Sequence, residues 1–185
     1  MTRMVLTGLL TVLAGCSSIP VGTGEGSSAA VSTVTGWVEK SFLLTDPGHA
    51  EFRALYEEVA VDENLAGMIH SLSGGVEVLV FYGPWCSDSR RLVPVFLRIA
   101  EKAGIPDERI RYYALDRSKK SSDGLTDQYA VQKVPTFILL QDGKEIGRVV
   151  ETPRTTLEGD IVAILVAAAP HGGVMRADRP LLSGG

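Results

Sequence analysis

The pattern of apolar and polar positions divides the chain into helices and strands. Hydrophobic side chains recur at three- and four-residue steps over Pro47–Ala60 and Leu65–Leu72, which predicts two helices. Ser73-Gly74-Gly75 then interrupts the helical pattern. Residues Val76–Tyr82 form a short β-branched and aromatic run that is almost wholly apolar. Such a run predicts a central strand that is buried on both faces.

Helical and strand-like segments alternate through the rest of the chain. Arg90–Ala103 shows one apolar face at helical spacing. The later segments predict strands and helices in turn, over Arg109–Asp116, Leu125–Val131, Thr136–Leu140, Glu145–Val150 and Thr156–Ala169. Asp142-Gly143 marks a hairpin between the last two strands. This order predicts an α/β fold: a right-handed βαβ unit with a parallel strand pair, extended into a small mixed sheet with helices on both faces.

The N-terminus has the features of a targeting segment. Arg3 precedes an apolar stretch over Val5–Leu13 that is too short to span a bilayer. The stretch ends in Leu13-Ala14-Gly15-Cys16, which resembles the lipobox of bacterial lipoproteins. The alternative is an ordinary secretory signal with a chance cysteine. We therefore predict a signal peptide over residues 1–15, a lipid anchor and flexible tether over 16–36, a folded domain with an N-terminal helical extension over 37–169, and a loose tail over 170–185.

The lipobox resemblance implies a place in the cell envelope. Its cysteine, Cys16, carries the lipid that holds such proteins on a membrane, facing the periplasm. Lipoproteins kept in the inner membrane of many Gram-negative bacteria have Asp after that cysteine, whereas Ser17 and Ser18 follow it here. The outer membrane is therefore favoured over the inner one.

The composition and the number of cysteines limit the partners and the kinds of site that the chain can have. The chain of 185 residues has a formal charge of −4 and no long basic run, which argues against a nucleic-acid partner. His49, His70 and His171 lack ligand spacing, so we expect surface or capping histidines and neither a metal site nor a cofactor. The sequence has two cysteines. If Cys16 is lipidated, Cys86 is the one thiol left, and any disulfide must join another molecule.

Four local motifs resemble the thioredoxin superfamily, over Trp37–Ala169. They are Trp85-Cys86-Ser87-Asp88-Ser89 between a strand and a helix, Pro94 eight residues after Cys86, Val134-Pro135-Thr136-Phe137, and Gln141-Asp142-Gly143-Lys144. The chain looks closer still to a bacterial thioredoxin-like subgroup that carries Trp-Cys-x-Asp-Ser-Arg. Two positions depart from thioredoxin: Ser89 replaces its resolving cysteine, and Val80 replaces its buried acid.

The resemblance implies that Cys86 is the catalytic nucleophile at the start of a helix. The free N–H groups and positive dipole end of a helix N-terminus favour a thiolate there. Ser89 could donate a hydrogen bond to this thiolate, and Arg90 adds positive charge. Asp88 opposes the thiolate, unless its carboxylate pairs with Arg90 or Arg91.

The resemblance also implies a substrate-binding edge opposite the cysteine. A cis peptide bond between Val134 and Pro135 would turn the Val134 backbone toward Cys86, so that an extended peptide could add there as a strand. Thr136 continues this segment, and Trp85 would offer an apolar rim. Glu151 could pair with Arg90 or Arg117, it could shape the choice of substrate, or it could simply mark a solvent-exposed strand end.

Three functions are compatible with these residues. The favoured one is monothiol thiol–disulfide exchange, in which Cys86 forms a mixed disulfide with a protein or small-molecule thiol and an external thiol releases it. The alternative is a binding or scaffold module that uses the cis-proline groove without turnover. The third is an iron–sulfur site shared with glutathione, as in monothiol glutaredoxins. These carry Cys-Gly-Phe-Ser, so Asp88 and the expected export argue against it.

Overall fold

The computed structural model describes residues 34–169. Along the chain its elements are β1 (Gly36–Val38), α1 (Lys40–Thr45), the 3-10 turn η1 (Pro47–His49), α2 (Ala50–Glu58), α3 (Glu63–Leu72), β2 (Val76–Tyr82), α4 (Ser87–Lys102), the 3-10 turn η2 (Asp107–Arg109), β3 (Ile110–Ala114), α5 (Leu125–Gln128), β4 (Thr136–Gln141), β5 (Lys144–Val150) and α6 (Leu157–Ala168).

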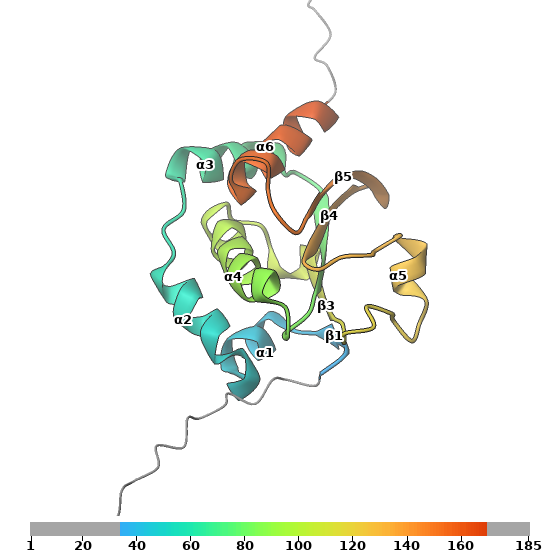
Figure 1. The fold of residues 1–185 in the computed structure, drawn as a ribbon. Coiled ribbons are helices and arrows are strands. Elements are labelled where there is room, and N and C mark those ends of the chain that lie inside the picture. The colour runs from blue at the N-terminus through green and yellow to red at the C-terminus, as the bar shows by residue number, and fades with distance from the viewer. Residues whose placement is uncertain (1–33, 170–185) are drawn as a thin grey trace, which may run out of the picture.

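The five strands form one mixed sheet in the order β1-β3-β2-β4-β5 (Figure 1). Strands β2 and β3 are parallel, and the other neighbours are antiparallel. Helices α1, α2, α3, α4 and α6 contribute to the apolar cluster on one face, while the segment around α5 packs on the other. The predicted mixed sheet with helices on both faces is confirmed.

Strand β2 occupies the centre of the sheet. Only Glu77 of its seven residues is exposed. Successive side chains point to opposite faces, so Val80 and Tyr82 join the larger cluster while Leu79 and Phe81 join the smaller one. The predicted central strand, buried on both faces, is confirmed.

The first folded elements differ from the sequence prediction. Strand β1 and helix α1 were not predicted, and Gly36 begins β1 although it falls in the range assigned to the tether. Val34 also packs against the larger apolar cluster. The folded domain therefore reaches back to Val34, because the short β1 pairs along β3. The signal peptide, Cys16 and the C-terminal tail lie outside the described residues.

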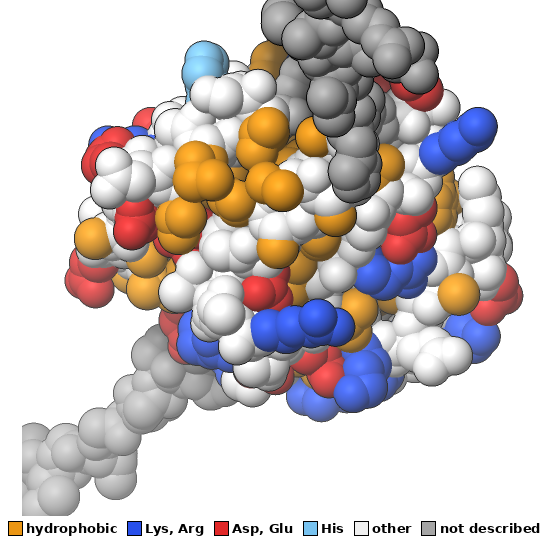
Figure 2. Space-filling view, turned by 90° about the horizontal axis from the view of Figure 1, so that it is seen from above, with side chains coloured by type: hydrophobic (Ala, Val, Ile, Leu, Met, Phe, Trp, Pro, Cys, Tyr) orange, Lys and Arg blue, Asp and Glu red, His pale blue; other side chains and the backbone are white. Residues whose placement is uncertain are grey.

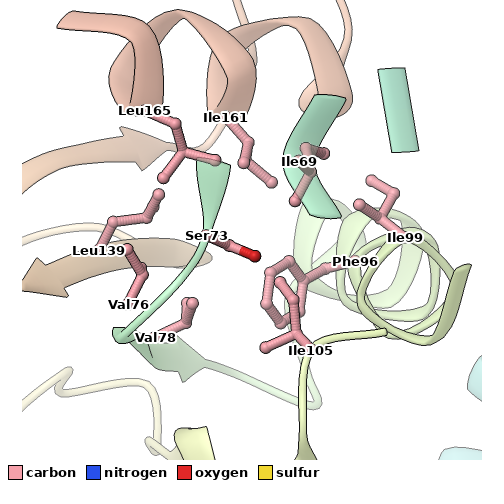
Figure 3. Close-up of a pocket in the computed structure, with 10 residues that line it drawn as sticks. All are labelled: Ile69, Ser73, Val76, Val78, Phe96, Ile99, Ile105, Leu139, Ile161 and Leu165. Carbon is pink, nitrogen blue, oxygen red and sulfur yellow. The ribbon is translucent and has the colours of Figure 1, made fainter. Parts of the chain in front are cut away.

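A small cavity lies between the sheet and helices α3, α4 and α6 (Figure 3). Its lining is apolar except for Ser73, whose hydroxyl group points into the ring of surrounding side chains. The volume is about 10 Å³, which is at the lower limit for a single water molecule. The cavity is therefore a packing gap and has no room for an organic ligand.

Hydrophobic side chains also gather on the surface at one end of the molecule, seen from above in Figure 2. Met68 of α3 and Val166 of α6 are among the exposed apolar residues, at 43% and 52% exposure. Helix α3 lies near the C-terminal end of α4, where His70 Nδ1 hydrogen-bonds the Ala103 carbonyl group at 2.9 Å. This end of the molecule is thus opposite the start of α4 (Figure 1).

His49 is buried and links the N-terminal extension to the central strand, so the expectation of a surface histidine is wrong. It occupies the N-cap position of α2, but its side chain makes no capping hydrogen bond. Its side chain is fully buried, with T-shaped ring contacts to Phe42 and Phe52. Nδ1 donates to the Asp46 carboxylate at 2.8 Å, and Nε2 accepts from the Tyr82 hydroxyl group at 3.2 Å. Burial, and secondarily the negative charge of Asp46, raises the pKa of Tyr82 far above its usual value. Tyr82 therefore stays a neutral donor.

We expect Tyr82→Phe to lower the free energy of unfolding by about 1–3 kcal/mol, because it leaves His49 Nε2 buried without a donor. Tyr112→Phe is the matched control. Tyr112 is also buried, but its hydroxyl group has no hydrogen-bond partner among residues 34–169, so its loss should be neutral or slightly stabilising. Urea unfolding of both variants provides the measurement. Equal losses in the two variants would contradict the role assigned to His49.

Candidate functional site

Cys86 lies where the central strand passes into helix α4. After β2 ends at Tyr82, the chain turns so that the Cys86 N–H donates to the Gly83 carbonyl group at 2.9 Å. Cys86 is the N-cap residue of α4, and its own carbonyl group accepts from the Arg90 N–H at 3.0 Å. The thiol is half-buried and is the only free cysteine between residues 34 and 169. The side chain of Cys86 makes no capping hydrogen bond to the first turn of α4.

The segment before β4 lies against the cysteine. The Val134–Pro135 peptide bond is cis, as expected. The Cys86 thiol donates to the Val134 carbonyl oxygen, with Sγ at 3.3 Å from it. Val134 is buried, at 2% exposure, and packs in the smaller apolar cluster beside Cys86. The thiol and the cis-proline segment therefore form one site.

Ser89 has a different partner from the thiolate that the sequence suggested. It is fully buried, and its hydroxyl oxygen accepts from the Gly83 N–H at 3.1 Å. The bond ties the first turn of α4 to the end of β2. Ser89 thus holds the loop that presents Cys86.

The charge pairs around the site differ in part from expectation. Asp88 pairs with Arg91 at 3.1 Å, one of its two expected partners, whereas Arg90 reaches Glu51 of α2 at 3.3 Å. The expected pairing of Glu151 with Arg90 or Arg117 is wrong.

Glu151 pairs with Lys133 instead. The backbone of Glu151 is left-handed, with φ at 53°, and its N–H donates to the Pro135 carbonyl group at 2.8 Å. This geometry brings the carboxylate to 2.7 Å from Lys133 Nζ, and the hydrogen bond raises the pKa of Lys133. The pair flanks the cis-proline segment.

Trp85 forms a fixed platform beside the cysteine. Its indole Nε1 donates to the Leu115 carbonyl group at 2.9 Å. The ring lies so close to Gly83 that a Cβ atom there would come within 2.7 Å of it. The guanidinium group of Arg117 lies over this ring, 5.1 Å from its centroid. The sequence placed Trp85 at the rim of the site but gave no sign of this contact, because Arg117 lies on a separate loop.

The side chain of Thr136 does not line the site. Thr136 is 1% exposed, and its hydroxyl group donates to the Lys133 carbonyl oxygen at 2.7 Å. It supports the turn that leads into the cis-proline. The sequence predicts Thr136 as a substrate-binding residue, and the structure shows that its side chain is buried away from the surface of the site.

A family model described as thioredoxin matches residues 43–163. The chain belongs to the thioredoxin family. The thioredoxin of Chlamydia trachomatis is 33% identical over 91 residues, which span 49% of this chain and 80% of that protein. A thioredoxin-like protein of Acanthamoeba polyphaga mimivirus is 26% identical over 106 residues, 57% of this chain and 74% of that protein. Membership of the thioredoxin family supports a general role in thiol–disulfide exchange.

Two solved structures resemble this thioredoxin-family chain. A Pseudomonas aeruginosa protein of unknown function is 20% identical, with a TM-score of 0.49, over 65% of this chain and 82% of that one. Fasciola hepatica thioredoxin is 26% identical, with a TM-score of 0.38, over 54% of this chain and 90% of that one. Residues 34–169 contain neither a candidate metal site nor a candidate membrane span. No group of His, Cys, Asp and Glu side chains there is arranged to hold a metal ion, and no helix there combines the length and the apolar composition of a membrane span.

We expect Ser89→Ala to lower the free energy of unfolding by about 1–3 kcal/mol, because the buried Gly83 N–H loses its acceptor. Ser87 follows Cys86 directly and is exposed. Ser87→Ala should therefore change the free energy of unfolding by less than about 0.5 kcal/mol. Chemical denaturation of both variants tests this. A loss at Ser87 as large as that at Ser89 would refute the loop-holding role of Ser89.

Proposed function

We propose that this protein exchanges thiols and disulfides through Cys86 alone. The observation that carries the proposal is a half-buried thiol at the start of α4, 3.3 Å from the Val134 carbonyl oxygen beside the cis-proline. The thiolate of Cys86 is the nucleophile in the proposed exchange. We assign the chain to the bacterial subgroup that carries Trp-Cys-x-Asp-Ser-Arg.

In the proposed reaction, the Cys86 thiolate attacks one sulfur of a substrate disulfide. A new S–S bond forms, the substrate S–S bond breaks, and its electron pair leaves with the second sulfur as a thiolate. Thioredoxins complete the cycle with a second cysteine, but that position holds Ser89, whose hydroxyl group is already bonded to Gly83. The mixed disulfide must therefore be cleaved by a thiol from another molecule.

The substrate would lie along the edge formed by Trp85, Val134 and Pro135. Trp85 supplies an apolar wall next to Cys86, and Lys133, two residues before Pro135, pairs with Glu151. An extended chain could align here with the backbone before β4, as in strand addition. The fixed geometry of the edge favours an extended segment around the target disulfide.

We also propose that Cys16 carries a lipid and that the protein faces the periplasm, on the outer membrane in preference to the inner one. The support is the sequence Leu13-Ala14-Gly15-Cys16 after an apolar stretch. The segment between Cys16 and Val34 would act as a tether. As a flexible coil, about 17 residues reach roughly 20–25 Å, enough to keep the domain clear of the lipid head groups.

The monothiol mechanism predicts a long-lived mixed disulfide. With 2-hydroxyethyl disulfide and no added thiol, the wild-type protein should hold the mercaptoethanol adduct on Cys86, as followed by intact mass. Ser89→Cys should lose the adduct as an internal disulfide forms, because the new thiol lies one helical turn away. Ser71→Cys, an exposed site on α3, is the control with the same number of thiols and should keep the adduct.

Two results would overturn the mechanism. One is a wild-type adduct that disappears without added thiol. The other is a partner protein that Cys86→Ser captures as well as the wild type does, which would indicate the binding module.

Lipidation of Cys16 predicts that a fatty-acid label is attached to that residue alone. A palmitate analogue fed to bacteria that express the full chain should be incorporated into the wild type and into Cys86→Ser, but not into Cys16→Ser. Separation of inner and outer membranes by density then gives the location. Unlabelled wild-type protein, or label that survives in Cys16→Ser, would rule out lipidation at Cys16.

A further inference from the structure

We propose that Arg117 makes the Cys86 site selective for disulfides that carry carboxylate groups near the sulfur atoms. The inference rests on the proposed exchange function and adds its substrate class. It depends on one positively charged group, the Arg117 guanidinium, which lies over Trp85, the residue before Cys86, and forms no ion pair among residues 34–169.

Six other charged side chains near the site are paired within the protein. Their ion pairs are Asp88–Arg91, Arg90–Glu51 and Glu151–Lys133. Among residues 34–169, Arg117 forms no ion pair. The neighbouring Asp116 is engaged elsewhere, because its carboxylate accepts from both the N–H and the hydroxyl group of Ser118. Within residues 34–169, therefore, no carboxylate pairs directly with the Arg117 guanidinium group, and Asp116 holds its negative charge against Ser118.

The position of this charge is fixed by the indole ring below it. The Leu115 N–H donates to the Tyr82 carbonyl group at 2.8 Å, and the Leu115 carbonyl group accepts from Trp85 Nε1. The ring is thereby tied to the end of β2. A guanidinium group 5.1 Å from the ring centroid gains a cation–π interaction, which keeps the charge over Trp85, next to Cys86 in the chain.

The positive charge of Arg117 would favour the attack of Cys86 on a negatively charged disulfide. A substrate with flanking carboxylates arrives negative and releases a thiolate, so negative charge accumulates beside the sulfur during attack. The protein as a whole has a formal charge of −4 and repels such substrates. A local cation reverses that repulsion at the point of attack.

The test compares three aliphatic disulfides of similar size that differ in charge: 3,3′-dithiodipropionate, 2-hydroxyethyl disulfide and cystamine. Rates of adduct formation on Cys86 are measured at low ionic strength. Arg117→Gln should slow dithiodipropionate about three- to tenfold, the effect of one nearby charge in a watery environment. The rate with 2-hydroxyethyl disulfide should stay within about twofold, and cystamine should react faster.

Arg111→Gln is the matched control. The guanidinium group of Arg111 also lies over a tryptophan, 3.9 Å from the ring centroid of Trp37, but β3 places it opposite Leu79, well before the cysteine. This variant makes the same change in net charge and should leave the order of the three rates unchanged. Arg117→Lys should retain most of the preference, and high salt should remove it.

A second experiment asks whether the same preference for carboxylates applies to peptide disulfides as well as to small molecules. Disulfide-bridged peptides with Glu or with Gln beside the cysteine should differ in rate in the wild type but not in Arg117→Gln. Equal slowing of all three small disulfides by Arg117→Gln, or no change in any, would overturn the inference while leaving the exchange function intact. Failure of the wild type to react even with 2-hydroxyethyl disulfide would instead overturn the proposed function.

Discussion

The burial of β2 is the interaction on which the site depends. The strand pairs with β3 on one side and β4 on the other, and its side chains fill both apolar clusters. Each large apolar side chain buried in this way contributes about 1.5–3 kcal/mol. The last antiparallel pair joins Phe81 to Thr136, so the residues just before β4 arrive beside the loop that follows β2. This register brings the Val134 carbonyl group to the thiol of Cys86.

The elements around the site could be predicted because their signals are local. The apolar run of β2, the Asp142-Gly143 turn and the amphipathic pattern of α4 all lie within short stretches of sequence, and each agrees with the fold. Strand β1 was missed because three residues are too few to show an alternation, and it exists through pairing with β3. The burial of His49 was missed for a related reason, since it depends on Tyr82, 33 positions away.

The charge partners could be narrowed from the sequence but not assigned. Asp88 and Arg91 are three residues apart on one helix, so their pairing follows from helical geometry. Glu151 meets Lys133 only because its backbone is left-handed at the end of β5, and no periodicity encodes that angle. Arg117 meets Trp85 across a loop whose path the sequence pattern leaves open.

The pairing of β1 with β3 determines the end of the sheet at which the chain enters the domain. Gly36 lies opposite Ala114, and Ala114 lies opposite Tyr82 at the end of β2. The chain therefore enters the domain at the end of the sheet that leads into Cys86. Helix α6 ends at the other extremity (Figure 1). A support joined directly before Val34, with no tether between, would therefore stand on the side of the reactive sulfur, whereas a carrier joined directly after α6 would stand on the opposite side.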